Sequence, residues 1–158
     1  MITLIACMAH NRVIGRDNEI PWHIKEDFIH FKNYTLNKTC IMGRKTFLSL
    51  NEKPLPKRNN IVLTRDLSFY KDRKDIKVVS SLDEILKHYK NSEEELIVMG
   101  GETVYRQALP FADKIVLSII HRDYEGDTYF PEFEDNFKVD EIKNYDEFDV
   151  YYYKRNDY

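Results

Sequence analysis

The chain has 158 residues, of which 24 are basic and 27 are acidic, so its formal net charge at pH 7 is −3. This balance argues against a protein that coats nucleic acid, because such binding needs a surplus of lysine and arginine. The length is typical of one domain, so we expect residues 1–158 to share one core without a disulfide or metal staple.

Strand-like runs occur in chain order at 2–8, 39–42, 60–64, 76–80, 96–99 and 113–120, and helical stretches separate several of them. Near-continuous apolar runs such as 61–63 and 96–99 are typical of strands that are buried on both faces, which favours a parallel sheet. The segments 137–143 and 148–155 have no room between them for a crossover helix, which predicts an antiparallel hairpin. The pattern therefore predicts an α/β fold with a mixed, mainly parallel sheet and a C-terminal antiparallel hairpin.

Residues 9–23 interrupt this plan, because glycine, proline and asparagine break every regular pattern along the segment. A loop of this length without secondary structure is usually functional or disordered. Apolar residues at 13–14 and 20–22 give the segment surface with which it can dock, which favours a mobile lid. An ordinary surface loop remains the alternative.

Asp27 lies on the apolar stripe of a helix that we expect after Trp22. It follows Ile24 by three residues and precedes Phe31 by four, so it points toward the buried face. A charged carboxylate among apolar side chains needs a cationic or hydrogen-bonding partner. A flat nitrogen heterocycle stacked among Phe28, Phe31 and Trp22 would provide one. The alternative is an acid that only offsets the positive end of the helix dipole.

Two expected strand-to-helix turns begin with glycine. Gly43 precedes Arg44–Lys45, and the second turn contains Gly100–Gly101. Backbone N–H groups at a helix start attract phosphate, and glycine lets the backbone approach a ligand closely. Both turns follow strands of one sheet, at the edge where open α/β sheets bind nucleotides. The sequence therefore predicts a nucleotide site, although it lacks the GxGxxG fingerprint.

A third strand ends at Leu63, followed by Thr64 and Arg65. Together with Arg44 and Lys45, Arg65 could hold a 2′-phosphate, and no acidic residue is evident where a free ribose hydroxyl would bind. We therefore predict NADPH rather than NADH as the cofactor.

Short motifs are spread over nearly the whole chain: Val13-Ile14-Gly15, Ile20-Pro21-Trp22, Asp27, Ile41-Met42-Gly43-Arg44, Pro54-Leu55-Pro56 with Arg58-Asn59, Met99-Gly100-Gly101, and Glu125-Gly126-Asp127-Thr128 with Phe130-Pro131. In order and spacing this set resembles bacterial dihydrofolate reductase. The resemblance implies an eight-stranded mixed sheet with four flanking helices. It also implies reduction of 7,8-dihydrofolate to tetrahydrofolate by NADPH, and inhibition by antifolates.

The resemblance further implies roles for single residues. Asp27 would bind the pterin and help to protonate N5 through water ordered by Trp22, while Ser118, in place of the usual threonine, would hydrogen-bond Asp27. Arg58 would bind the glutamate α-carboxylate. The implied substrate-binding residues are Ile5, Cys7, Asp27, Phe28, Phe31, Leu50, Leu55, Arg58, Met99, Tyr105 and Ser118. The implied cofactor-binding residues are Cys7, Ile14, Gly15, Ile20, Gly43, Arg44, Lys45, Thr46, Leu63, Thr64, Arg65, Ser80, Gly100, Gly101, Glu102, Thr103, Val104 and Tyr105.

The resemblance also makes Gly100–Gly101 similar to a cis-linked glycine pair and lets Asp127 latch the 9–23 segment. Glu102 departs from the family pattern, because it would bring an acidic group toward the cofactor phosphates. Two other interpretations stay open. The chain could be a nucleotide-binding module without catalysis, or a reductase of another heterocycle, which would need neither Asp27 beside Trp22 nor Arg58.

The two cysteines, Cys7 and Cys40, each lie in an apolar run without a partner at metal-ligand spacing. We expect buried thiols with no bridge between them, a cytoplasmic location and no metal site. The apolar run at 1–8 is too short for a membrane span and lacks the basic leader of a signal peptide, so we expect no membrane contact. A monomer is expected by default.

Overall fold

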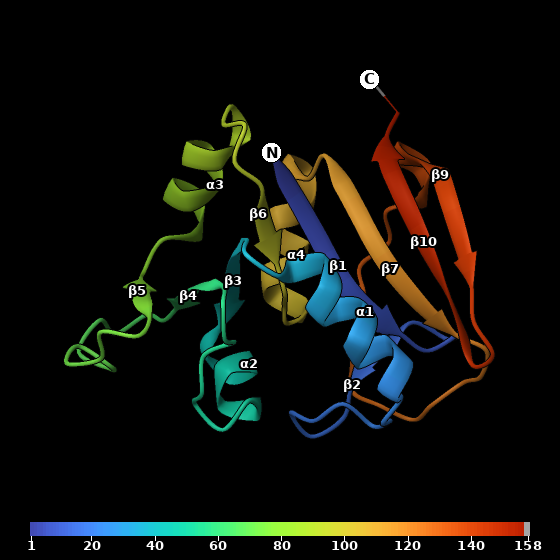
Figure 1. Cartoon of the computed structure of the whole chain (residues 1–158), viewed down its shortest axis with the longest axis horizontal. Helices are drawn as coiled ribbons and strands as arrows, with labels where there is room; N and C mark the ends of the chain where they lie inside the picture. Colours follow the sequence, from blue (N-terminus) through green and yellow to red (C-terminus); the bar gives the residue numbers. More distant parts are fainter. Residues whose placement is uncertain (157–158) are drawn as a thin grey trace.

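The computed structural model describes residues 1–156 of the chain. The strands of the main sheet follow the predicted chain order, with boundaries that differ from prediction by a residue or two (Figure 1). The strands are β1 (Ile2–Met8), β2 (Val13–Gly15), β3 (Thr39–Gly43), β4 (Asn59–Leu63), β5 (Lys77–Val79), β6 (Leu96–Val98), β7 (Lys114–Ile120), β8 (Thr128–Tyr129), β9 (Phe137–Asn144) and β10 (Phe148–Arg155). The α-helices are α1 (Lys25–Thr35), α2 (Arg44–Ser49), α3 (Leu82–Lys90) and α4 (Glu102–Ala108), and 3₁₀ turns lie at Leu109–Phe111 and Glu134–Asn136. No helix among these residues is long and apolar enough to cross a membrane.

Eight strands form one sheet in the order β5-β4-β3-β6-β1-β7-β10-β9. Neighbours from β5 through β7 are parallel, whereas β10 is antiparallel to both β7 and β9. The predicted mixed sheet with its C-terminal hairpin is therefore confirmed. The parallel part directs the C-terminal ends of β1, β3, β4, β6 and β7 to one edge. Many of the predicted site residues lie on these strands or on the loops and helices that follow them.

Both faces of the parallel strands are covered, because side chains of the central strands contribute to two different apolar clusters. On β1, Leu4 belongs to a cluster that includes residues of α3 and α4, while Ile5 belongs to another with Trp22 and Ile24, next to the start of α1. Figure 1 shows α1 in front of the sheet and α4 behind it. Alternation of neighbouring side chains between opposite faces explains why these strands are almost continuously apolar in sequence.

The 9–23 segment is more regular than predicted. The expectation of a stretch without secondary structure is wrong for Val13–Gly15, which form β2 and pair antiparallel with β8. An isolated antiparallel bridge follows between Arg16 and Glu19. These short pairings lie outside the main sheet and hold the segment against residues 126–130.

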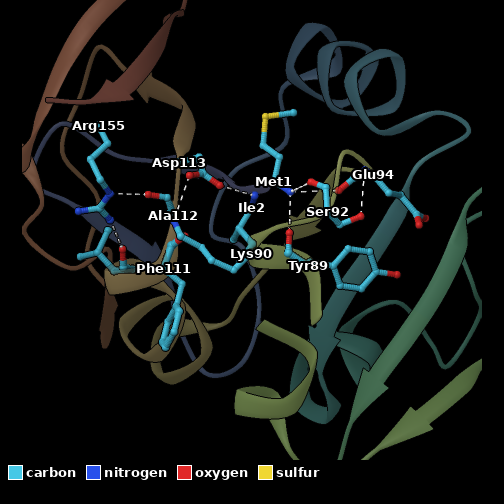
Figure 2. A network of polar contacts seen from close by, with 11 residues as sticks. Met1, Ile2, Tyr89, Lys90, Ser92, Glu94, Phe111, Ala112, Asp113 and Arg155 are labelled. Carbon is cyan, nitrogen blue, oxygen red and sulfur yellow. Dashed lines mark hydrogen bonds and ion pairs between the residues drawn. The ribbon is translucent and has the colours of Figure 1, made fainter. Parts of the chain in front are cut away.

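Polar contacts fasten the opposite, N-terminal edge of the parallel strands (Figure 2). The backbone nitrogen of Met1 donates to the carbonyl of Tyr89, at the end of α3, at 2.7 Å. Asp113 accepts the backbone N–H of Ile2 at 2.8 Å and contacts Lys90 Nζ at 3.0 Å. These bonds connect the starts of β1 and β7 to the end of α3 and so stabilise the N-terminal edge of the parallel strands.

Candidate active site

The Asp27 carboxylate is held by a hydroxyl from the sheet. Asp27 lies in the first turn of α1, and its Oδ1 accepts a hydrogen bond of 2.7 Å from Ser118 Oγ on β7. The side chain is half-buried, so this bond orients the carboxylate while part of it stays accessible to a ligand.

Cys7 and Trp22 complete the surroundings of this carboxylate. Cys7 on β1 is in direct register with Ser118 on β7, so both side chains flank Asp27. Burial raises the pKa of the Cys7 thiol well above its usual value, and the charge of Asp27 and a hydrogen bond to it raise the pKa further. Trp22 is 8 % exposed and packs against Tyr124 with ring centroids 5.0 Å apart, and its interaction with the Cys7 sulfur partly offsets the rise in the pKa of that thiol. The thiol therefore stays protonated and acts as a further weak donor to Asp27.

We expect both thiols to resist alkylation in the folded state and to make stability fall at alkaline pH. Burial raises the pKa of Cys40 to about 12 and that of Cys7 well above its usual 9.0. Above pH 9 an unfolded thiol loses its proton while the folded one keeps it, so the free energy of unfolding decreases as pH rises. Urea unfolding between pH 7.5 and 10.5 measures this slope, and iodoacetamide labelling measures access.

The control for this prediction is the Cys7→Ala/Cys40→Ala protein. It should lose less stability over the same alkaline range, because neither of its side chains can release that proton on unfolding. Equal slopes in the two proteins would contradict the prediction.

Several apolar side chains of the predicted substrate site pack in the cluster that contains Trp22 and Cys7. Ile5 is 4 % exposed, and Phe31 and Met99 pack against the same cluster. Met99 also packs, with Leu50, against a further cluster around Phe47, so it bridges the two cores. Leu55 is half-buried, and its backbone N–H donates to Asn60 Oδ1 at 2.9 Å. These positions are compatible with an apolar wall.

The sequence predicts that the Phe28 ring lies among buried aromatic side chains, but the structure places it at the surface. Its side chain is 46 % exposed, and its ring packs on His23 with centroids 5.0 Å apart. Phe28 therefore leaves apolar surface uncovered on α1, one residue beyond Asp27.

Arg58 lies beside a cavity of about 420 Å³ that is lined by Lys32, Leu36, Pro56, Lys57 and Arg58. Arg58 Nη1 donates to Thr35 Oγ1 at 3.0 Å, and Nε donates to the carbonyl of Pro56 at 2.9 Å. Among residues 1–156, Nη2 has no partner. The guanidinium is thus oriented by two bonds, keeps free donors, and shares the cavity with two lysines and no carboxylate.

The predicted phosphate-binding turns meet at the C-terminal edge of the sheet. The backbone N–H of Gly43 donates to the carbonyl of Gly100 at 2.9 Å, and the Gly100–Gly101 peptide is cis, as the sequence resemblance implies. A Cβ on Gly101 would have only Thr46 Oγ1 nearby, at 3.8 Å, so room is open beside this backbone. Val104 packs close to Gly43, because a Cβ atom placed on Gly43 would lie 3.3 Å from Val104 Cγ2.

Glu102 and Tyr105, which follow Gly101 in the chain, each form a hydrogen bond with the backbone of a β-strand. Tyr105 is 5 % exposed and donates from its hydroxyl to the carbonyl of Ile5 at 2.7 Å, which holds its ring against Gly100. Glu102 Oε2 accepts the backbone N–H of Tyr129, on β8, at 2.6 Å. The acidic group that departs from the family pattern is therefore engaged by the chain itself.

The cations at this edge lie on neighbouring strand ends. Arg44 follows β3, while Thr64 and Arg65 follow β4, which pairs with β3 so that Gly43 is opposite Leu63. Thr64 is 6 % exposed, whereas Lys45 and Arg65 are exposed. Arg44 Nε is buried without a hydrogen-bond partner in the described part of the chain, which is the sign of a donor that awaits a ligand.

The other predicted cofactor residues lie around this edge. Ile14 and Gly15 are on β2, Ile20 is 55 % exposed beyond it, Ser80 follows β5, and Thr103 is exposed on α4. The expected contact between Asp127 and the 9–23 segment is present, because Asp127 Oδ2 accepts the backbone N–H of Asp17 at 3.0 Å. Asn18 also reaches α2, with 3.3 Å from its Nδ2 to the carbonyl of Lys45.

Sequence reasoning overlooked His30 as a neighbour of Asp27. Burial lowers the pKa of His30, the charge of Asp27 opposes that shift, and Nε2 has no hydrogen-bond partner among residues 1–156. The spacing of three residues from Asp27 on one helix was the available signal.

A half-buried acid near the C-terminal edge of the parallel strands of an α/β sheet, where such folds bind nucleotides, suits a nicotinamide-dependent reductase. Comparison with known proteins identifies which kind. Residues 1–158 match the family model described as dihydrofolate reductase. The chain therefore belongs to the dihydrofolate reductase family.

Individual relatives agree with this assignment. The chain is 41 % identical to the dihydrofolate reductase of Bacillus subtilis, with 99 % of this chain and 96 % of the relative covered. It is 44 % identical to the type 3 dihydrofolate reductase of Salmonella typhimurium, with 84 % and 80 % covered. A solved structure of the Enterococcus faecalis dihydrofolate reductase, complexed with NADP(H) and RAB-propyl, superposes with a TM-score of 0.89 at 31 % identity and covers 99 % of this chain and 97 % of that one.

Proposed function

We propose that this chain reduces 7,8-dihydrofolate to 5,6,7,8-tetrahydrofolate with NADPH, and that Asp27 is its catalytic acid. The observation that carries the assignment of Asp27 is its hydrogen bond with Ser118, which orients a half-buried carboxylate beside Cys7 on the neighbouring strand. Oxidation of NADPH, followed by absorbance with dihydrofolate present and with a diaminopyrimidine inhibitor added, tests the activity. No dihydrofolate-dependent oxidation would refute it.

The chain's own residues place the substrate and supply the proton. Asp27 accepts N–H groups from the pterin ring and fixes its orientation, while Ser118 and the Cys7 thiol hold the carboxylate in place. Trp22 orders the water through which a proton reaches N5. NADPH, when bound, supplies the hydride that reduces C6. Placement and exclusion of bulk water account for most of the protein's contribution.

The residues at the sheet edge fit a cofactor with a 2′-phosphate. The donor Arg44 Nε lacks a partner, space is open beside Gly101, and Lys45 and Arg65 are exposed cations nearby. We propose that Arg44, Lys45, Thr64 and Arg65 hold the 2′-phosphate, and that Gly43, Thr46 and Gly100–Thr103 hold the remaining phosphates. Ile14, Gly15, Ile20 and Tyr105 would then flank the nicotinamide, and Leu63 and Ser80 the adenosine.

We expect the Arg44→Ala/Arg65→Ala protein to bind NADP⁺ roughly 10²- to 10⁴-fold more weakly, with NAD⁺ binding changed less than about threefold. Each lost charge-assisted hydrogen bond is worth roughly 1.5–3 kcal/mol, and only NADP⁺ carries the group that receives it. Isothermal titration calorimetry with both nucleotides measures the ratio. The Arg106→Ala protein is the control, because Arg106 is an exposed cation on α4. A parallel loss for both nucleotides would exclude recognition of the 2′-phosphate.

We further propose that the protein acts as a cytoplasmic monomer. The two cysteines, Cys7 and Cys40, are free thiols, which suits a reducing compartment. Light scattering during size-exclusion chromatography tests the monomer, since a dimer would elute with twice the mass of 19.0 kDa.

A further inference from the structure

An aromatic ring covers one face of the Arg44 guanidinium. The Arg44 Cζ atom lies 3.9 Å from the centroid of the Phe69 ring. Phe69 comes from the 66–75 segment, the connection between β4 and β5, and 41 % of its side chain is exposed.

The backbone of the 66–75 segment is held by local contacts on both sides of Phe69. Ser68 donates from both its backbone N–H and its hydroxyl to Asp66 Oδ1, at 2.9 and 2.6 Å, and the N–H of Phe69 donates to the carbonyl of Asp66 at 3.1 Å. On the other side, Tyr70 has a left-handed backbone with φ of 64°. Its ring packs edge-on against the buried ring of Phe47, with centroids 5.3 Å apart. The backbone at Phe69 is thus held from both directions.

Arg44 has the properties of a cation that is held ready for an external anion. It makes no ion pair within residues 1–156, and its buried Nε has no hydrogen-bond partner there. In contrast, Arg73 on the same segment is paired with Asp75 at 2.7 Å. The ring of Phe69 fixes the plane of the Arg44 guanidinium without using any of its N–H donors.

We propose that Phe69 is a positioning residue for recognition of the cofactor's 2′-phosphate, because it holds the Arg44 guanidinium in the plane in which its N–H groups meet that phosphate. This inference rests on the proposed use of NADPH. An arginine that is already immobilised loses less rotational freedom on binding, so the stacked ring increases affinity for the phosphate that Arg44 contacts. A nucleotide without the 2′-phosphate gains nothing from the ring.

The test is binding of NADP⁺, NAD⁺, 2′,5′-ADP and 5′-AMP to Phe69 variants, measured by isothermal titration calorimetry. For Phe69→Leu, which keeps apolar bulk but loses the ring, we expect dissociation constants for NADP⁺ and 2′,5′-ADP to rise roughly 3- to 10-fold. Those for NAD⁺ and 5′-AMP should stay within twofold. Phe69→Tyr keeps the ring and should bind all four like the unchanged protein.

Two controls separate positioning from simple stabilisation of the segment. Leu67→Ala removes another exposed apolar side chain, 51 % exposed, from the same segment and should leave all four dissociation constants unchanged. In an Arg44→Ala background, Phe69→Leu should cause no further loss of NADP⁺ affinity, because its effect passes through Arg44. Thermal unfolding confirms that each variant is folded.

Equal losses of NADP⁺ and NAD⁺ affinity in Phe69→Leu would overturn the inference, as would losses that add to those of Arg44→Ala. Unchanged NADP⁺ affinity in Phe69→Leu would overturn it too. Failure of the proposed cofactor assignment looks different, because the unchanged protein would then already bind NADP⁺ no more tightly than NAD⁺.

Discussion

We expect the Asp27→Asn variant to reduce dihydrofolate roughly 10²- to 10⁴-fold more slowly than the unchanged protein at pH 7, while its affinity for NADPH stays within about twofold. Asparagine has the same shape and can still accept the Ser118 hydrogen bond, which is 2.7 Å long in the structure. What it loses is the negative charge that binds the pterin and keeps a proton within reach of N5. Stopped-flow measurement of hydride transfer, combined with NADPH titration, separates these two effects.

Glu26 provides a matched control for Asp27. It lies in the same first turn of α1, but its side chain is exposed, so Glu26→Gln makes the same chemical change one residue away. This variant should reduce dihydrofolate at a rate within twofold of the unchanged protein. Turnover by Asp27→Asn at the level of Glu26→Gln would remove Asp27 from the mechanism and leave it as an acid that offsets the helix dipole.

We expect the Arg58→Leu variant to bind dihydrofolate roughly 10- to 150-fold more weakly, which corresponds to about 1.5–3 kcal/mol for lost hydrogen bonds to a charged group. Thr35 and Pro56 already hold the guanidinium, so its remaining donors are oriented before a carboxylate arrives. Steady-state kinetics should show a raised KM with little change in kcat, because this contact is distant from the reacting atoms.

Two comparisons test whether Arg58 binds the tail carboxylate. A dihydropterin without the glutamate tail should bind equally well to the unchanged protein and to Arg58→Leu. Lys57→Leu removes a neighbouring charge from the same cavity, but Lys57 makes no side-chain hydrogen bond within residues 1–156, so its effect should stay below about threefold. If the tailless pterin were weakened as strongly as dihydrofolate, the contact with the tail would be disproved.

The sequence predicted the main sheet well, because its strands carry strong local signals. The runs at 2–8 and 96–99 are apolar throughout, and β1 and β6 are found there as neighbours. The short strands β2 and β8 were missed, since each has only two or three residues and depends on pairing with a segment more than 100 residues away. No local pattern encodes such a pairing.

The candidate site was partly predictable, because some of its residues also lie in patterns that are local in the sequence. Helical spacing placed Asp27 on the inward stripe, and its partner Ser118 came from the family resemblance. Cys7 lies near Asp27 because the register of β1 and β7 places it opposite Ser118, and a single sequence does not reveal this register. Phe69 was missed because its importance comes from a ring stacked on Arg44 across a loop, a contact without a sequence pattern.

The hydrogen bond between Glu102 and the backbone of Tyr129 links two parts of the molecule that the sequence treats separately. Tyr129 belongs to β8, β8 pairs with β2, and Glu102 opens the helix that follows the paired glycines. Any swing of the 9–23 segment that carries β8 along must therefore either pull on the first turn of α4 or break this bond. Movement of the 9–23 segment and loosening of the backbone after Gly100–Gly101 are in this way mechanically joined.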